Sequence, residues 1–321
     1  MFWMVRRVLL ASPRGYCAGV ERAVDTVEKL LDLHGPPVYV RKQIVHNAHV
    51  VRDLEARGAI FVEDEREVPE EETVVLSAHG VAPSVYRNAE ARRLNTIDAT
   101  CPLVTKVHVQ ARRYAADGYT VLLIGHEGHE EVVGTTGEAP DSTILVQSVA
   151  DAEALELEPG AKVAYITQTT LSVDETGEII TALRRRFPDI HAPKKEDICY
   201  ATSNRQWAVK DLLSEVELLL VIGSRNSSNS NRLVEVARAG GIAAHLIDDE
   251  TDIDEAWLDD VETVGVTSGA SAPEKLVERV CDWFRAHGVD DISAHRMVDE
   301  DVEFRLPVEL RRELALAESQ S

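Results

Sequence analysis

The middle of the chain reads Cys101-Pro-Leu-Val-Thr-Lys-Val-His-Val-Gln-Ala-Arg-Arg-Tyr-Ala-Ala116, then Tyr119-Thr-Val-Leu-Leu-Ile124, then Gly125-His-Glu-Gly-His-Glu-Glu131. Residues 102–116 can form a helix, and 119–124 is a continuous apolar run typical of a buried strand. In parallel sheets, the loops that follow strands collect at the carboxyl edge, where ligands bind. A cysteine followed by a helix, a strand and a polar loop therefore predicts one α/β unit with its functional residues in the loop.

The same layout occurs after Cys17 and after Cys199. Helices are expected at 18–33 and 203–215, and each is followed by a β-rich apolar run that ends in a polar loop. The matching apolar runs are Val38-Tyr-Val40 and Val216-Glu-Leu-Leu-Leu-Val-Ile222.

We call each of these three cysteines, together with the helix, strands and polar loops that follow it, a lap. The spacing within the three laps agrees closely. His46, His129 and Ser227 lie 29, 28 and 28 residues after their respective cysteines, all in the first polar loop of a lap. Each lap then has a second apolar run and a second polar loop, followed by a helix start marked by Pro or Ser. The second loops contain His79-Gly80, Thr169-Thr170 and Ser268-Gly-Ala-Ser271.

These repeats predict an α/β protein built from three lobes with mostly parallel sheets. We expect a pseudo-threefold, trefoil-like arrangement in which each lobe presents one cysteine and two polar loops to a shared centre. The last stretch is acidic and is expected to be a tail that wraps on the surface or is partly disordered. The expected parts are lobe 1 at 14–101, lobe 2 at 102–196, lobe 3 at 197–288 together with 1–13, and the tail at 289–321.

The composition limits the function classes. The 321 residues include 34 Lys and Arg against 56 Asp and Glu, a net charge of −22, which argues against a nucleic-acid or anionic-membrane surface. No segment approaches the roughly 20 apolar residues that span a bilayer. The first apolar run stops at Ser12, too early for a secretory signal, so we expect a cytoplasmic protein with reduced thiols.

Four cysteines are too few for a disulfide scaffold in a chain of this length. Three thiolates that converge from three lobes could bind zinc, form a catalytic thiol site or carry an iron–sulfur cluster. Zinc sites usually contain paired ligands such as C-x₂-C, which this chain lacks. A [4Fe–4S] cluster usually has four Cys ligands, so three would leave one iron open. Cys281 lies on the apolar face of a predicted helix and is expected to be a core residue.

Several of these strings closely resemble the IspH/LytB family, the 4-hydroxy-3-methylbut-2-enyl diphosphate reductases. The resemblance covers about residues 5–287. The strings that carry it are Ser12-Pro-Arg-Gly-Tyr-Cys17-Ala-Gly-Val-Glu-Arg-Ala23, Asp98-Ala-Thr-Cys101-Pro-Leu-Val-Thr-Lys106, Gly125-His-Glu-Gly-His-Glu-Glu-Val-Val-Gly-Thr135, Thr167-Gln-Thr-Thr-Leu-Ser-Val-Asp174, Ile198-Cys199-Tyr-Ala-Thr-Ser-Asn-Arg-Gln206, Gly223-Ser-Arg-Asn-Ser-Ser-Asn-Ser-Asn-Arg232 and Ser268-Gly-Ala-Ser-Ala-Pro273.

The resemblance implies an iron–sulfur oxidoreductase of the last step of the non-mevalonate (MEP/DXP) isoprenoid route. There, (E)-4-hydroxy-3-methylbut-2-enyl diphosphate is reductively dehydroxylated to isopentenyl and dimethylallyl diphosphates. It also implies one [4Fe–4S] cluster per chain, central to the three lobes, with Cys17, Cys101 and Cys199 as ligands and one open iron.

The family's proton-donating acid falls on Glu131, and the adjacent Glu130 should point elsewhere. The resemblance also implies a set of substrate-binding residues. Each histidine of this set can donate a hydrogen bond, and protonation near neutral pH would add positive charge. The implied substrate-binding residues are His46, His79, His129, Thr169, Ser227, Ser228, Asn229 and Ser271.

The electrons must come from a partner, because the chain contains no flavin or nicotinamide fingerprint. Ferredoxin or flavodoxin is the donor that the resemblance implies. Such donors are commonly acidic, and the basic residues Arg184–Arg186 and Lys194-Lys195 offer a hypothetical docking patch, although a solvated helix face explains them equally well.

Two other functions remain compatible with the cysteines. A non-catalytic iron–sulfur module that senses redox state would need the thiols but not Glu131 or the diphosphate-binding residues. A zinc or thiol hydrolase of a phosphorylated metabolite would need no electron donor.

Overall fold

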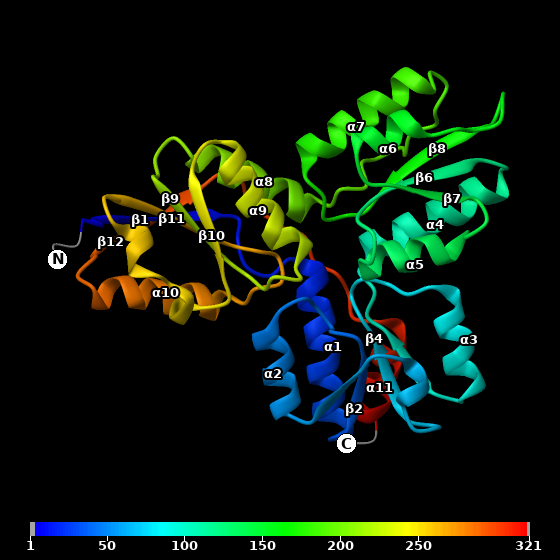
Figure 1. Ribbon diagram of the computed structural model, residues 1–321. Coiled ribbons are helices and arrows are strands. Elements are labelled where there is room, and N and C mark those ends of the chain that lie inside the picture. The colour runs from blue at the N-terminus through cyan, green and yellow to red at the C-terminus, as the bar shows by residue number, and fades with distance from the viewer. Residues whose placement is uncertain (1–3, 320–321) are drawn as a thin grey trace. The chain divides into compact units, whose positions relative to one another are not determined.

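The computed structural model describes residues 4–319 and confirms an α/β fold with three parallel sheets (Figure 1). Every pair of named strands in this part of the chain is parallel. The chain separates into two compact units. The first comprises the chain up to Ala18, His46–Val50 and Tyr200–Glu303, and the second comprises Gly19–Val45, Val51–Cys199 and the chain from Phe304 on.

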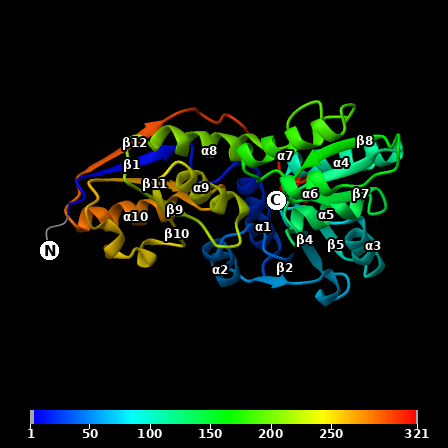
Figure 2. The ribbon, with the colours of Figure 1, turned by 45° about the horizontal axis from the view of Figure 1, so that its top comes forward.

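The first unit contains a sheet in the order β10-β9-β11-β1-β12. Its strands are β1 (Arg7–Ser12), β9 (Leu218–Ile222), β10 (Ala243–Ile247), β11 (Thr263–Ser268) and β12 (Asp291–Arg296). Its helices are α8 (Tyr200–Leu212), α9 (Ser228–Ala239) and α10 (Glu274–Ala286), with short 3₁₀ helices η2 (Glu250–Asp252) and η3 (Glu255–Leu258). Figures 1 and 2 show β12 beside β1 at the sheet edge.

Strand β9 is buried at every residue because helices cover both faces of this sheet. Leu220 packs in a cluster with Val280 and Phe284 of α10. Leu219, which points to the opposite face, packs in a second cluster with Leu212 of α8. The continuous apolar run in the sequence therefore reflects burial on two sides, as expected for a central parallel strand.

The second unit contains one sheet in the order β3-β2-β4-β5 and another in the order β7-β6-β8. The strands are β2 (Val38–Arg41), β3 (Ala59–Val62), β4 (Thr73–Leu76), β5 (Asn95–Asp98), β6 (Thr120–Ile124), β7 (Thr143–Val146) and β8 (Val163–Thr167). The remaining helices are α1 (Ala18–His34), α2 (Ala48–Ala56), α3 (Pro83–Ala91), α4 (Pro102–Ala116), α5 (Glu130–Glu138), α6 (Val149–Ala154), α7 (Val173–Arg186), α11 (Val308–Glu318) and the 3₁₀ helix η1 (Glu65–Glu67).

The helices expected after the cysteines are confirmed, with small differences at their boundaries: α1 ends one residue later than expected, at His34, and α8 ends three residues earlier, at Leu212. Helix α8 begins at Tyr200, three residues before the expected start at 203. Its first turns are polar in sequence but buried in the structure, including Thr202, Arg205 and Gln206. Polar residues are typical of a loop, and the sequence alone does not reveal that these side chains are buried.

The acidic segment 289–321 is more ordered than the sequence indicates. It contains β12, which pairs with β1 from Arg7 to Ser12, and α11, in which Leu310 is fully buried. The pairing satisfies the backbone of β1 on its outer side, so the segment completes the sheet despite its charge. The outermost residues of the expected lobe 3 and tail, 1–3 and 320–321, lie outside the described residues.

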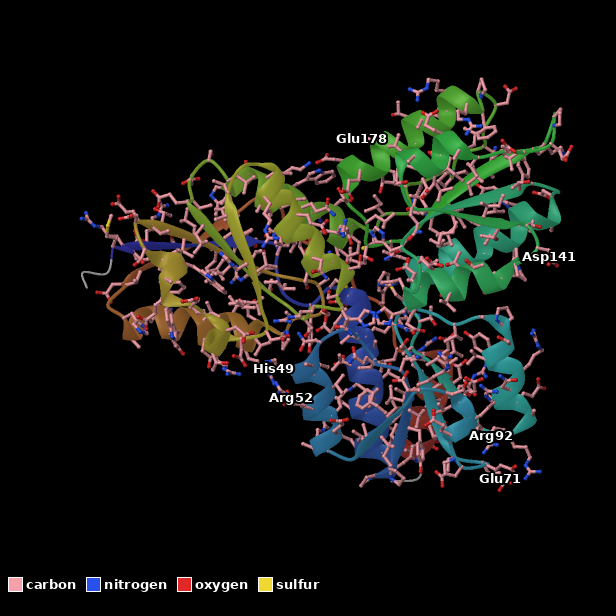
Figure 3. All side chains as sticks on the ribbon, in the orientation of Figure 1. His49, Arg52, Glu71, Arg92, Asp141 and Glu178 are labelled. Atoms are coloured by element: carbon pink, nitrogen blue, oxygen red, sulfur yellow. The ribbon has the colours of Figure 1, made fainter. Side chains whose placement is uncertain are left out.

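Acidic side chains on the surface account for much of the negative charge. Glu71, Asp141 and Glu178, which are labelled in Figure 3, are exposed on the second unit. No helix among residues 4–319 is both long enough and apolar enough to cross a membrane.

We predict that Cys281→Ala leaves the iron content of the protein unchanged. Cys281 is 4% exposed and packs in one cluster with Val280 and Phe284 of its own helix. Burial also raises the pKa of its thiol, which disfavours the thiolate needed for metal binding. The substitution should lower the free energy of unfolding by about 1 kcal/mol. Urea denaturation and iron analysis check this, and a lower iron content would contradict it.

Candidate functional site

The three cysteines that begin the laps share one local setting. Cys101 is the N-cap residue of α4, Cys17 directly precedes α1, and Cys199 directly precedes α8. None of the three forms a disulfide within the described part of the chain, and all are partly exposed. A helix N-terminus is a favourable place for negative charge, and the thiolate is the form of cysteine that binds metals.

The backbone of each cysteine is fixed by the second polar loop of a lap. The amide of Cys17 donates to the carbonyl of Ala270 (3.2 Å), that of Cys101 to Ala78 (3.0 Å) and that of Cys199 to Thr169 (3.0 Å). Ala270 and Ala78 directly precede the implied substrate residues Ser271 and His79, and Thr169 is itself one of them. Thiol positions and substrate-binding positions are therefore set by the same loops.

The three cysteines supply the kind of ligand that iron–sulfur clusters use. Residues 4–319 contain no group of three or more His, Cys, Asp or Glu side chains arranged to hold a metal ion. Cys17 belongs to the first unit, and Cys101 and Cys199 belong to the second. Three accessible thiols at helix N-termini are the ligand chemistry that iron–sulfur clusters use.

Glu131 is a buried carboxyl group held by one residue of the neighbouring loop. It lies in the first turn of α5, is 2% exposed, and accepts hydrogen bonds from the amide (2.6 Å) and hydroxyl (3.1 Å) of Thr169. Burial raises the pKa of Glu131 to about 7, against the opposing effect of these hydrogen bonds. A carboxyl group with this pKa is suited to donate a proton near neutral pH.

Two of the implied substrate histidines lie together in the second unit. The rings of His79 and His129 are edge to face, with their centroids 5.9 Å apart. The Nδ1 atom of His129 accepts a hydrogen bond from the amide of Glu131 (3.2 Å). A neutral His129 ring must then carry its proton on Nε2.

The first unit contributes hydroxyl and amide groups. Ser227 is the N-cap residue of α9, and its Oγ atom accepts from the amide of Ser230 (3.3 Å). Ser271 Oγ lies 3.5 Å from Ser227 Oγ and donates to the carbonyl of His46 (2.9 Å). These groups surround a helix N-terminus, which is a favourable place for a phosphate group.

Asn229 and Ser228 follow directly in α9. The side-chain carbonyl of Asn229 accepts from the amide of Ala270 (2.8 Å), which joins the first polar loop of this lap to the second. Ser228 is half-buried, whereas Asn229 is buried. The structure thus brings Ser227, Asn229, Ser271 and His46 together within the first unit.

The expectation that protonated histidines add charge is wrong for His46. Burial lowers the pKa of His46 to about 4, so this ring is neutral at pH 7. It contributes a hydrogen-bonding group instead of a cation. Asn226 Nδ2 lies 3.3 Å from its Nδ1 atom.

The sequence reasoning missed small residues that let these loops come close to the helices. A Cβ atom on Gly223 would lie 2.2 Å from Ser230 Oγ, and one on Gly269 would lie 2.0 Å from the same atom. Gly80, whose φ is +76°, packs against His108 with 2.9 Å between a built Cβ and the ring. Each glycine follows a strand or a site residue, which is the signal that marks it.

Gln168 was also missed. It is 1% exposed, and its side-chain carbonyl accepts from the amide of His126 (3.1 Å) while its amide donates to Thr170 Oγ1 (2.9 Å). Gln168 therefore links the two polar loops of the second lap. Its position beside Thr169 in the sequence was the available signal.

Glu130 differs from Glu131 in exposure and partners, as the sequence predicts. Its carboxylate lies 3.6 Å from Lys42 Nζ and 4.0 Å from the Arg41 guanidinium, at one quarter exposure. Such exposed ion pairs stabilise a fold by about 0–1 kcal/mol. Glu130 therefore serves as a matched control for Glu131.

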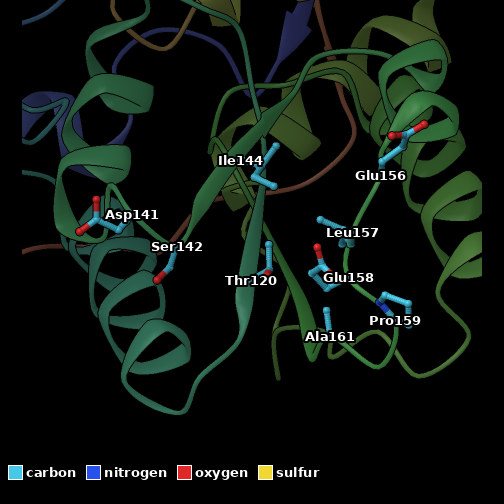
Figure 4. A pocket seen from close by; sticks show the side chains of 9 residues that line it. All are labelled: Thr120, Asp141, Ser142, Ile144, Glu156, Leu157, Glu158, Pro159 and Ala161. Carbon is cyan, nitrogen blue, oxygen red and sulfur yellow. The ribbon is translucent and has the colours of Figure 1, made fainter.

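A separate pocket lies at the amino ends of the strands of the β7-β6-β8 sheet (Figure 4). Its lining includes Thr120 at the start of β6 and Ser142 just before β7. Functional loops of parallel sheets follow the carboxyl ends of strands, and this pocket is at the amino ends. It is not part of the candidate site.

The chain is similar to known proteins over nearly its whole length. The sequence model of the family described as "LytB protein" matches residues 8–289. A protein of Acidothermus cellulolyticus named 4-hydroxy-3-methylbut-2-enyl diphosphate reductase is 63% identical over 96% of this chain and 91% of its own length. A protein of the same name from Streptomyces coelicolor is 59% identical over 96% of this chain and 92% of its own.

A solved structure of the E-1-hydroxy-2-methyl-but-2-enyl-4-diphosphate reductase from Plasmodium falciparum has the same fold. It matches with a TM-score of 0.94 and 37% sequence identity, and the alignment covers 98% of this chain and 99% of that one.

We predict that Glu131 makes the stability of the protein depend on pH. The folded pKa of about 7 lies above the ordinary value of 4.5, so the folded chain holds this proton more tightly than the unfolded chain. Stability should fall as pH rises from about 4.5 through 7, by a few kcal/mol. Urea denaturation of the wild type and Glu131→Gln between pH 5 and pH 8 measures the difference. An equal pH dependence in both proteins would show that Glu131 is ionised in the fold.

Proposed function

The chain belongs to the LytB family, and on this premise we propose that it reduces (E)-4-hydroxy-3-methylbut-2-enyl diphosphate to isopentenyl and dimethylallyl diphosphates. The observation that carries the proposal is the position of Thr169. Its amide and hydroxyl donate to Glu131, and its carbonyl accepts from the amide of Cys199. One residue thus links the acid to a thiol that would hold the redox cofactor.

Cys17, Cys101 and Cys199 would hold a [4Fe–4S] cluster with one iron left open. When bound, the cluster supplies single electrons and a Lewis acid for the hydroxyl oxygen of the substrate. The reaction consumes two electrons and two protons and releases water. The residues of the chain bind and orient the substrate and deliver the proton to the departing oxygen.

Glu131 donates that proton. Its pKa of about 7 keeps a large fraction of the carboxyl group protonated under physiological conditions. The two hydrogen bonds from Thr169 grow stronger once the carboxylate forms, because a charged acceptor binds its donors more tightly. Burial excludes water from this carboxyl group and directs its proton to the substrate.

The diphosphate is bound by hydroxyl, amide and imidazole donors and by helix N-termini. His129 presents an Nε2 proton, and Ser227 lies at the N-terminus of α9. This arrangement binds an anion without unpaired cations, although the chain carries a net charge of −22. The proposed donors are His46, His79, His129, Ser227, Ser228, Asn229 and Ser271, with Thr169 beside the hydroxyl group.

A ferredoxin or flavodoxin is proposed as the electron donor, with a smaller docking patch than the sequence suggested. Arg186 donates to backbone carbonyls at the end of α6, including those of Ala152 and Leu155, and so has a structural role. Arg184, Lys194 and Lys195 are exposed. Arg185 is exposed as well but is paired with Glu153, so these three are the residues proposed to contact an acidic partner.

Anaerobic purification tests the proposed function. The wild type should contain about four irons per chain and reduce the allylic diphosphate with a strong one-electron reductant. Glu131→Gln should keep the iron and bind substrate but lose turnover by at least about 100-fold, because the proton donor is gone. Glu130→Gln should stay within about twofold. A colourless protein that retains zinc and full activity would overturn the proposal.

The docking patch is tested by Arg184→Glu combined with Lys194→Glu and Lys195→Glu. The rate with ferredoxin or flavodoxin should fall several-fold and lose its dependence on salt, because steering by opposite charge is removed. The rate with dithionite should not change. Lys29→Glu on the exposed face of α1 is the control. Equal rates with the protein donor in the triple variant and the wild type would exclude this surface.

A further inference from the structure

Each helix that follows one of the three cysteines carries a cation near its start. Arg22 lies five residues after Cys17, and the other two cations have nearly the same spacing. All three side chains reach backbone carbonyls or carboxylates at sequence-distant loops instead of solvent. The cations are Arg22 of α1, Lys106 of α4 and Arg205 of α8.

Arg22 reaches the loop before Cys101. Its guanidinium donates to the carbonyls of Thr100 (3.0 Å) and Asp98 (3.3 Å). Its Nε atom also donates to the carbonyl of Arg305 in the C-terminal segment (2.8 Å). A cation on the helix after the first cysteine therefore holds the residue directly before the second.

Lys106 makes the corresponding contacts before Cys199. Its ammonium group donates to the carbonyls of Glu196 (2.6 Å) and Lys195 (3.0 Å) and lies 3.0 Å from the carboxylate of Asp197. The Asp197 side chain is fully buried and also accepts from the amide of Thr167 (3.2 Å). This ion pair fixes the loop that ends two residues later at Cys199.

Arg205 makes the third set of contacts, at the loop before Cys17. It is fully buried and donates to the carbonyl of Gly15 (2.8 Å). Glu300 of the acidic C-terminal segment neutralises it at 3.1 Å, and Asn204 holds the same carboxylate at 3.0 Å. An uncompensated buried guanidinium would be strongly destabilising, so Glu300 is needed for this contact.

We infer that Arg22, Lys106 and Arg205 are positioning residues that preorganise the three cysteine loops for the cluster. Each cation belongs to the lap of one cysteine and holds the loop of the next, in the cyclic order Cys17, Cys101, Cys199 and back to Cys17. We call these contacts the loop clamps.

Hydrogen bonds from charged donors are stronger than neutral ones, so a carbonyl held by a cation resists local opening. The inference rests on the proposed function insofar as the cysteines are taken as cluster ligands.

Amide hydrogen exchange of the full-length, metal-free chain tests the cyclic order. The amides of Cys101 and Cys199 are reporters, because both are hydrogen-bonded within the second unit. Arg22→Gln should speed exchange about tenfold or more at 99–101, whereas Lys106→Met should do so at 195–199. Neither should change exchange at Cys17. Exposed cations of the same helices supply the controls Lys29→Met and Arg113→Met, which should change neither reporter.

Lys106→Met leaves the buried Asp197 carboxylate unpaired, so a second variant is needed. Lys106→Met/Asp197→Asn removes the charge but keeps an acceptor for Thr167. Faster exchange at 195–199 in this double variant supports the clamp. Exchange that returns to the wild-type rate would assign the effect to the unpaired carboxylate and overturn the inference.

Iron retention gives the second readout. After anaerobic reconstitution, clamp variants should lose iron to a chelator several-fold faster than the wild type and the two control variants. The inference is overturned if each clamp variant loosens all three cysteine loops alike, if none loosens, or if the metal-free wild type already exchanges freely at both reporters. A wild type that takes up no iron would instead refute the proposed function, whereas the exchange pattern would stand by itself.

Discussion

The rest of the structure depends on one backbone hydrogen bond that occurs in each lap, from a cysteine amide to the carbonyl of a second polar loop. Ala270, Ala78 and Thr169 are the acceptors. A thiol at a helix N-terminus would otherwise move with its own helix, but this bond attaches it to the loop that carries a substrate residue. In the proposed function, cofactor and substrate positions are therefore coupled through the main chain, which agrees with the nearly constant spacing of the cysteines and the loops that follow them.

Acidic and basic residues occupy different places in the structure. The acidic surplus lies on outer surfaces such as those of Glu71 and Asp141 (Figure 3), whereas several of the 34 basic residues are used internally. Arg205 and Lys106 hold main-chain carbonyls beside the cysteines. Cations committed to carbonyls are not available to the diphosphate, so the proposed site would use hydroxyl, amide and imidazole donors.

The parallel sheets of the three lobes could be predicted from the sequence, because apolar runs, helix starts and cysteine offsets are local patterns that one sequence displays. Burial and long-range pairing were not readable. His46 stands in a polar loop yet is enclosed, which keeps it neutral, and the acidic segment around β12 pairs with β1. The residues of the loop clamps, Arg22, Lys106 and Arg205, lie at nearly constant spacing from their cysteines in the sequence. A cation on a helix ordinarily indicates a solvated face, so this spacing became informative only when the structure showed the carbonyls that the cations contact.

Thr169 illustrates why the chemistry and the fold are not separable here. Two of its three relevant bonds use the backbone, and only the hydroxyl contact to Glu131 depends on the side chain. The amide holds the acid and the carbonyl holds Cys199, so both are placed by one peptide segment at the end of β8. A shift of this strand would move acid and thiol together and preserve their relation. In the proposed function, the residue that positions the proton donor is thus the same one that positions a cofactor ligand.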